Sequence, residues 1–294
     1  MRWFCLALLL VSWFLVPRPA QACAVCSQSS PTLTGAGGEK AYDGRLRASV
    51  DGRAGSARTG SGAGLVQLDD RRLELALAYA PTPDFLAAVV VPGLYRSMRS
   101  QKASGGEAVL GDVDARTSYR LWSSDDRQRQ LHLVSGLKFP TAPIQSDREG
   151  RPLSAELQPG CGSLVPYVGV DYTSTIRMWT LSSGGAVFVP VPVREGPHPG
   201  YSARARAAAQ VQPIRYLAAR AGVSARFDAT GELAPGQNDP NSGGLVGYAT
   251  AGLLVSPTSD LVVSLEAFFP VLQSLRGDHR ELTIFGAGVA YDFR

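Results

Sequence analysis

Residues 201–212 decide the fold: they read Tyr-Ser-Ala-Arg-Ala-Arg-Ala-Ala-Ala-Gln-Val-Gln. The odd positions are apolar, whereas most of the even positions carry serine, arginine or glutamine. Because successive side chains of a β-strand point to opposite faces, this segment has one apolar face and one charged face. Residues 217–228 repeat the pattern, with Arg220 and Arg226 on the polar side.

Units of this kind recur along the chain of 294 residues, each about ten residues long. That length matches a tilted strand that crosses a bilayer, and it exceeds the five or six residues usual in soluble sheets. The alternation predicts strands at residues 42–51, 72–81, 85–96, 113–121, 129–139, 163–173, 176–189, 201–212, 217–228, 244–256, 259–270 and 281–293.

The predicted connections alternate between short and long. Short turns are expected at residues 81–84, 123–128, 174–175, 213 and 257–259. The other connections are longer and rich in Gly, Pro, Asp and Arg, at residues 52–71, 97–108, 140–162, 190–200, 230–243 and 271–280. Bacterial outer-membrane barrels have short periplasmic turns and long extracellular loops. An even number of strands puts both termini on the periplasmic side.

These patterns predict an all-β fold, a closed antiparallel up-and-down transmembrane β-barrel of about 12 strands. Inside hydrocarbon an unpaired backbone group costs several kcal/mol, so a sheet that spans a membrane must close and leave no edge. An arginine facing lipid at the bilayer midplane costs about 2–4 kcal/mol, so the charged face must look inward. The alternative is a soluble β-sandwich, whose strands also alternate.

The inward face predicts a lumen lined by charged residues. Nine basic and seven acidic side chains fall on it, which indicates a slight preference for anions. The alternative is that these charges pair across strands and only fill a narrow barrel. With His132, the predicted lumen-lining residues are Arg45, Arg47, Glu74, Asp112, Asp114, Arg116, Arg120, His132, Lys138, Asp171, Arg204, Arg206, Arg220, Arg226, Asp228, Glu266 and Asp292.

The N-terminus predicts export. Arg2 precedes an apolar run, and Ala20-Gln21-Ala22 places small residues where a signal peptidase cleaves. We therefore expect a signal peptide at residues 1–22, a periplasmic arm or plug at 23–41, and an outer-membrane barrel at 42–294 of a Gram-negative bacterium. Lipidation of Cys23 is the alternative, but Ala20 stands where a lipoprotein has a larger aliphatic residue.

The arm carries Cys23-Ala24-Val25-Cys26, a spacing that lets two thiols pair or share a soft metal. Ser27 follows instead of histidine, which excludes covalent haem attachment, and a zinc site would need two more ligands nearby. The two interpretations are a small disulfide that fixes the N-terminus and a periplasmic redox or metal-related role. We expect no resident metal and no cofactor.

Composition and motifs do not favour catalysis or nucleic-acid binding. The formal charge falls from +4 to +2 once Arg2 and Arg18 leave with the signal peptide, too little for a nucleic-acid partner. No G-x-S-x-G elbow occurs, and the glycine-rich run at residues 60–64 has no following lysine for a phosphate cradle. We predict no enzyme. A lipid hydrolase at the barrel rim, using His132, is the alternative of this class.

Three short motifs follow one another in a recognisable order. They are Gly111-Asp112-Val113, then Gly136-Leu137-Lys138-Phe139-Pro140-Thr141, then Gln158-Pro159-Gly160-Cys161-Gly162. This order resembles the outer-membrane proteins labelled as transporters of phenol-degradation pathways. The sequence departs from that family's pattern at Ala142, where glycine is usual, at Cys161, where a small residue such as serine is usual, and at the trailing Arg294.

The resemblance implies a barrel channel for small molecules. The last strand places Val289, Tyr291 and Phe293 on one face, a pattern similar to the C-terminal signal of the outer-membrane assembly machinery. The expected partners are therefore membrane lipid, that machinery and a small-molecule solute, but no nucleic acid. We predict a porin-like transporter for passive uptake or efflux. The alternative is a non-conducting barrel that acts as a scaffold or binding protein.

Overall fold

The computed structural model describes residues 44–60, 65–100, 104–145, 158–160, 162–194, 197–234, 236–240 and 242–293. The predicted signal peptide and arm, with Cys23 and Cys26, lie outside these residues, as do Cys161 and Arg294. Predictions about those segments stay predictions. Within the described ranges, no helix is long and apolar enough to cross a membrane.

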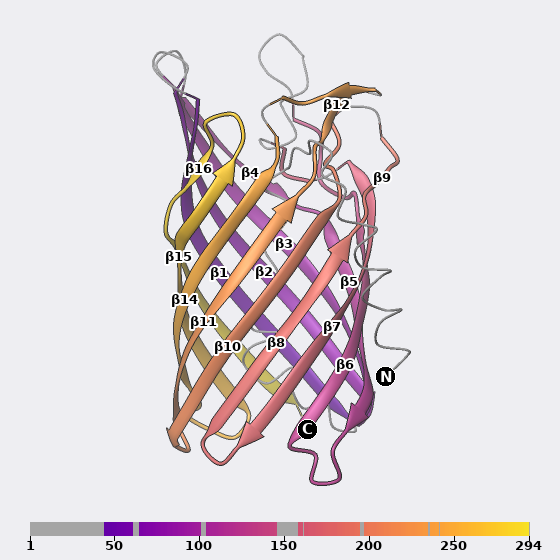
Figure 1. Cartoon of the computed structure of the whole chain (residues 1–294), viewed down its shortest axis with the longest axis vertical. Coiled ribbons are helices and arrows are strands. Elements are labelled where there is room, and N and C mark those ends of the chain that lie inside the picture. Colours follow the sequence, from indigo (N-terminus) through magenta and orange to yellow (C-terminus); the bar gives the residue numbers. More distant parts are fainter. Residues whose placement is uncertain are drawn as a thin grey trace, which may run out of the picture.

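Twelve long strands form one closed antiparallel barrel, which confirms the predicted fold (Figure 1). Each long strand pairs with its neighbours in chain order, and the first strand pairs with both the second and the last. The strands are β1 (Arg45–Thr59), β2 (Val66–Thr82), β3 (Phe85–Ser100), β5 (Val113–Ser123), β6 (Arg129–Phe139), β7 (Ser163–Ile176), β8 (Trp179–Phe188), β10 (Ser202–Ile214), β11 (Leu217–Asp228), β14 (Gly244–Val255), β15 (Leu261–Leu275) and β17 (Ile284–Phe293).

Short strands lie at the end of the barrel that carries the long loops (Figure 1). β4 (Ser104–Leu110) pairs with the outer part of β3, and β9 (Val191–Pro192) pairs with the start of β7. β16 (Arg280–Glu281) pairs with β1, while β12 (Glu232–Ala234) and β13 (Gln237–Asn238) form a separate hairpin. The long connections are therefore partly built structure, not bare loops.

Several predicted boundaries were wrong. Most of the predicted loop at residues 52–71 is strand, because the β1–β2 ladder continues to the pair of Thr59 and Val66. The predicted turn at residues 174–175 lies instead at Arg177 and Met178. Arg177 has a φ of 54°, a conformation in which glycine is usual, so its arginine side chain gave no sign of a turn.

Pro213 was expected to be a turn but lies within β10, and the turn is formed by Arg215 and Tyr216. The β10–β11 register shifts between Val211 and Ile214. Proline has no N–H to donate, and an irregularity in the ladder is where a strand tolerates it.

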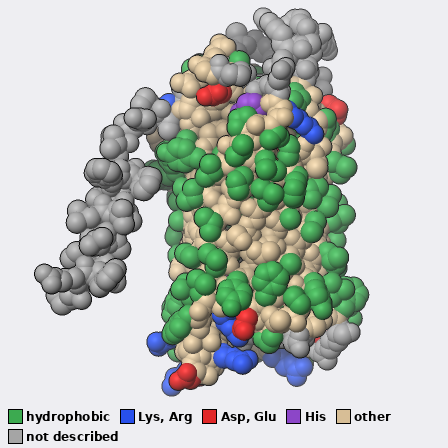
Figure 2. All heavy atoms as spheres, turned by 90° about the vertical axis from the view of Figure 1, so that its right-hand side faces the viewer, with side chains coloured by type: hydrophobic (Ala, Val, Ile, Leu, Met, Phe, Trp, Pro, Cys, Tyr) green, Lys and Arg blue, Asp and Glu red, His purple; other side chains and the backbone are tan. Residues whose placement is uncertain are grey.

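The two faces of the wall have opposite character. Large apolar side chains such as Leu75, Leu77 and Val223 are half exposed on the outside. In Figure 2 apolar side chains are spread over the wall, and charged ones show towards its two ends. Charged side chains such as Arg45 and Glu74 are buried on the inside. A soluble domain hides its apolar residues, so this inverted arrangement suits a barrel surrounded by lipid.

Candidate functional site

The interior holds a cavity of about 280 Å³ to which most of the long strands contribute side chains. Eight basic and five acidic residues line it. The charged lining residues are Arg53, Arg72, Glu74, Asp112, Asp114, Arg116, Lys138, Asp171, Arg204, Arg206, Arg220, Arg226 and Glu266, and His132 also lines it. Apolar residues from β3 and β8, such as Val90 and Phe188, complete the wall.

The predicted lumen residues divide into two groups. Twelve of them line the cavity: Glu74, Asp112, Asp114, Arg116, His132, Lys138, Asp171, Arg204, Arg206, Arg220, Arg226 and Glu266. The other five lie outside the cavity lining: Arg45, Arg47, Arg120, Asp228 and Asp292. Arg120 forms an ion pair with Asp84 beside the turn that joins β2 to β3.

Sequence reasoning missed two charged cavity residues, Arg53 and Arg72. Both lie in the part of β1 and β2 that was assigned to a loop or to a strand edge. The signal was present, because Asp51 and Arg53 continue the odd-numbered polar face that begins at Arg45. Gly52 and Gly55 interrupted the pattern and suggested a loop instead.

At the short-turn end a buried ion-pair cluster joins the first and last strands. Asp292 accepts hydrogen bonds from Arg45 Nε at 2.9 Å and Nη2 at 2.8 Å, and from Arg47 Nε and Nη2, both at 2.6 Å. All three side chains are buried. Removal of the carboxylate would leave two guanidinium groups without their shared partner, which is strongly destabilising for buried ion pairs.

Two aromatic rings organise the lumen where the β7–β8 ladder ends on the long-loop side. Tyr167 stacks on Phe188 with ring centroids 4.6 Å apart, and its hydroxyl donates to Asp114 Oδ1 at 2.9 Å. Arg204 Cζ lies 4.0 Å from the centroid of the Phe188 ring, and Lys138 Nζ lies 5.7 Å from it. Cations held over an aromatic face are stabilised by its electron density, so one ring positions two positive charges.

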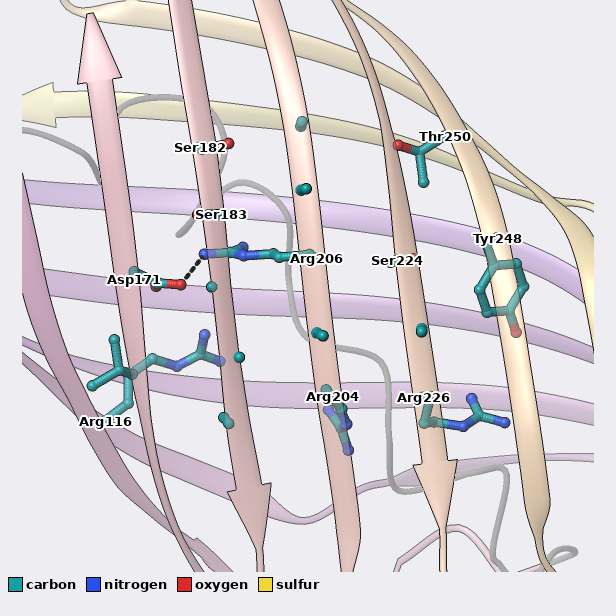
Figure 3. Close-up of a pocket in the computed structure, with 18 of the residues that line it drawn as sticks. Arg116, Asp171, Ser182, Ser183, Arg204, Arg206, Ser224, Arg226, Tyr248 and Thr250 are labelled. Carbon is teal, nitrogen blue, oxygen red and sulfur yellow. Dashed lines mark hydrogen bonds and ion pairs between the residues drawn. The ribbon is translucent and has the colours of Figure 1, made fainter. Parts of the chain in front are cut away.

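The wall built by β8, β10, β11 and β14 mixes short side chains with arginines. Ser182, Ser224 and Thr250 lie on the same run of neighbouring strands as Arg204, Arg206 and Arg226 (Figure 3). Arg206 reaches past β8 to Asp171 on β7, with Nη2 to Oδ1 at 2.8 Å (Figure 3). The short side chains leave room in the lumen beside the arginines of the same wall.

Towards the long-loop end, Arg226 joins the lumen to an inward-folded loop. Its Nε donates to Asp228 at 2.6 Å, and it also forms an ion pair with Glu281 of β16. Glu281 further accepts a hydrogen bond from Tyr248, and its backbone N–H donates to Gln273 at 2.8 Å. The loop between β15 and β17 is therefore fixed to the interior, not to solvent.

His279 belongs to the same loop and is buried. Its Nδ1 lies 2.6 Å from the hydroxyl of Thr59. Burial, and then the positive charge of Arg226, lower the pKa of His279 to about 4. The imidazole is therefore neutral at physiological pH.

The three motifs that resemble the transporter family meet at one place beside the long-loop end. Thr141 donates to the carbonyl of Gly111 at 2.9 Å, and Asp112 Oδ1 accepts from the backbone N–H of Ala142 at 3.1 Å. A Cβ at Gly160 would lie 2.4 Å from the Ala142 side chain and 2.5 Å from Asp112 Oδ1. Only glycine fits there, so the three motifs pack closely against one another across β5, β6 and β7.

The histidine of the proposed rim hydrolase faces the lumen. His132 lies 3.3 Å from the Ser118 hydroxyl and 3.1 Å from Gln130 Oε1, and it is buried. A second serine–histidine contact, Ser163 to His198 at 3.2 Å, is also buried. Neither pair meets lipid at a rim. No group of three or more His, Cys, Asp or Glu side chains in the described ranges is arranged to hold a metal ion.

No family model and no curated protein matches this sequence. An outer membrane channel from Pseudomonas putida F1 matches with a TM-score of 0.73 and 12% identity, over 90% of this chain and 100% of that one. The translocator domain of the autotransporter NalP from Neisseria meningitidis matches with a TM-score of 0.50 and 11% identity, over 84% and 88%.

The β-domain of the Bordetella autotransporter BrkA also matches, with a TM-score of 0.50 and 12% identity over 85% of this chain and 100% of that one. At these identities the likeness concerns the fold alone. The chain is a twelve-stranded antiparallel β-barrel that is similar in fold to barrels of the bacterial outer membrane.

Proposed function

We propose that this protein is an outer-membrane channel through which small solutes pass by diffusion, with a preference for anions. The observation that carries the proposal is the cavity inside a closed barrel, where basic residues outnumber acidic ones by eight to five. A lumen with a charge excess admits solutes of the opposite sign more readily. The channel needs no cofactor and performs no catalytic turnover.

The outer surface supports a place in the membrane. Half-exposed leucine, valine and aromatic side chains surround the barrel, and the backbone groups of the wall are paired between strands. Short turns then face the periplasm and the long loops face outward, as in known outer-membrane barrels. Assembly through the C-terminal strand, with the signal peptide cleaved before Cys23, belongs to the same proposal.

The size of the cavity limits the solute. Small-molecule pockets in proteins begin at about 300 Å³, close to the volume found here. Barrels of eight strands are filled by side chains, whereas those of sixteen to eighteen leave a wide aqueous channel. Twelve strands with a lining of long arginines suit ions and small organic solutes.

Reconstitution of the folded protein into planar lipid bilayers tests the proposal. We expect discrete conductance steps, and a reversal potential in a potassium chloride gradient that shows chloride to be more permeant than potassium. Folded protein that inserts but shows no conductance step would remove the channel function and leave the barrel intact.

A second candidate is the non-conducting barrel that binds a partner through its loops. It is favoured by the hydrogen bonds that tie the loops together at the long-loop end, from Arg96 to the Gln158 carbonyl at 3.0 Å and from Arg194 to the Ala142 carbonyl at 2.8 Å. A C-x-x-C arm in a periplasmic redox or metal-related role belongs to this candidate. Loop deletion that leaves permeability unchanged but abolishes partner binding would support it.

A further inference from the structure

One sector of the outer surface is charged where the rest of the wall is apolar. Of the described strands, only β1, β2, β3 and β16 carry charged side chains on the outward face, apart from Arg129 at the short-turn end. Four of these side chains are exposed arginines: Arg58, Arg71, Arg99 and Arg280. We call them the arginine patch.

The arginine patch carries more positive charge than its own residues neutralise. Arg58 lies directly opposite Arg280, and Gln67 separates Arg58 from Arg99 across two strand pairs. Like charges directly opposite each other destabilise a sheet. The single acid on this face, Asp69, accepts hydrogen bonds from Ser56 at 2.6 Å and from Gln67. A bound anion would relieve the repulsion.

The surface beside the arginine patch is hollow. A concavity of about 770 Å³ is lined by Arg71 and Arg99 together with the hydroxyl-bearing residues Ser97 and Thr283. Asp69 and Asp70 line it too, but Asp69 accepts hydrogen bonds from Ser56 and Gln67, and Asp70 forms an ion pair with Arg96. Arginine guanidinium groups bind phosphate through paired hydrogen bonds, and hydroxyl groups add further donors. The lining therefore suits a phosphate group.

An apolar groove of about 1380 Å³ joins this concavity on the outside of the barrel. The two share Ala54, Arg71, Tyr95 and Phe285. Farther along the wall the groove is formed by large and very small residues in one row, where Leu73 lies between Gly52 and Gly93. A polar hollow that continues into an apolar groove complements a lipid, because the hollow suits a charged headgroup and the groove suits an acyl chain.

The level of the arginine patch fits the headgroup region. Leu46 pairs with Tyr79 and Phe293 at the short-turn end, whereas Ala54 pairs with Arg71 and Phe285. The eight steps from Leu46 to Ala54 rise about 26 Å along the strand, or roughly 20 Å along the barrel axis at a tilt of about 40°. The outward apolar band of such barrels is about 25 Å tall, so the arginine patch stands at its outer edge.

We propose that this sector binds a phosphorylated glycolipid of the extracellular leaflet, of the lipid A class. Arg71 and Arg99 hold a phosphate in the hollow, with Arg58 and Arg280 adding positive charge, and an acyl chain lies in the groove beside Gly93. The inference rests on the proposed function for the membrane location and orientation of the barrel, but not on conduction.

The test is titration of the purified full-length protein with diphosphoryl lipid A, followed by native mass spectrometry. The variant Arg71→Gln/Arg99→Gln should bind about tenfold more weakly or worse, because it loses two charge-assisted contacts. The matched control Arg127→Gln/Arg129→Gln, in exposed positions at the short-turn end, should bind like the wild type.

A second variant tests the groove. A Cβ at Gly93 meets only the Leu73 carbonyl oxygen, at 3.8 Å, so the backbone there accepts a side chain, and Gly93→Leu should place its isobutyl group in the groove. It should weaken lipid A binding and leave binding of inorganic phosphate unchanged.

The inference is overturned if the double-arginine variant binds diphosphoryl lipid A like the wild type. It is also overturned if dephosphorylated lipid A or phosphatidylglycerol binds the wild type equally well. Conductance measured on the same samples separates the two proposals. Wild-type protein that conducts but does not bind lipid A refutes the lipid site alone, whereas lipid A binding without conductance supports the lipid site and refutes the channel.

Discussion

Reversal of one lumenal charge should change the ion selectivity of the channel. Arg220 lines the cavity, and its Nη2 lies 3.5 Å from Ser182 Oγ of β8. Glu266 lines the cavity as well. Arg220→Glu replaces one positive charge by a negative charge without removing a side chain that joins strands by an ion pair, so the barrel should still fold.

The expected size follows from Coulomb's law. A permeating ion roughly 6 Å from the side chain interacts with one unit charge by about 0.7 kcal/mol at the dielectric constant of water. Charge reversal changes two unit charges, so it raises the energy of chloride by about 1.4 kcal/mol and lowers that of potassium by the same amount; the ratio of their permeabilities should change by about 2.8 kcal/mol, or about a hundredfold. Arg220→Gln changes one charge and should alter the ratio by about 1.4 kcal/mol, or about tenfold.

The assay is the reversal potential in planar bilayers under a potassium chloride gradient. The ratio of chloride to potassium permeability should fall in the order wild type, Arg220→Gln, Arg220→Glu. Arg215→Glu, in the exposed turn that precedes the same strand, serves as the control and should change the ratio less. Equal reversal potentials for all four conducting proteins would refute the view that ions pass beside Arg220.

Three further changes test the packing of the barrel. Gly136→Ala places a Cβ 2.3 Å from the Tyr167 ring, so it should lower the free energy of unfolding by about 1–3 kcal/mol in urea titrations; Gly93→Ala, which meets no clash, is the control. Thr141→Ala removes a hydroxyl that bridges two backbone groups and should cost about 1–3 kcal/mol, whereas Thr141→Ser should restore it; equal stability of both would contradict the argument. Because burial lowers the pKa of His279 to about 4, the unfolded form binds the proton first, and the loop should lose up to about 3 kcal/mol of stability as pH falls from about 6.5 to 4. The protection factors of amide hydrogen exchange in that loop, which correct for the intrinsic slowing of exchange as pH falls, should decrease over this range in the wild type but not in His279→Gln. The same pH dependence in both would refute the assignment.

Alternation along the chain was sufficient to predict all twelve long strands, because one face of every strand meets a different environment from the other. The alternation pattern failed to predict strands where the two faces differ little in polarity. In the outer halves of β1 and β2 the pattern is interrupted by glycines and by charges on both faces, and a loop was expected. The positions of two tight turns were also missed, since Arg177 and Arg215 carry no typical turn signature, whereas the turns predicted at residues 81–84, 123–128 and 257–259 lie where they were expected.

The candidate site was predictable in one respect only. Alternation along a strand predicts which side chains face inward, and in the structure most of those side chains line one cavity. The odd or even position of a residue does not determine which strands face each other across the lumen, nor the register between neighbouring strands. The contact of Arg204 with Phe188 and the reach of Arg206 to Asp171 depend on register and tilt, which alternation does not contain.

The amino-acid sequence alone determined the strand number, the inverted polarity of the wall and the ends at which loops are short or long, because each is a local property of about ten residues. Only the tertiary structure decided which side chains meet and where the outer hollow lies. The carboxylate that binds Arg45 lies 247 residues away along the chain, and Arg280 of β16 joins the arginines of the consecutive strands β1, β2 and β3 only when the barrel closes. Contacts between distant segments follow from register, and register is set by the whole cylinder.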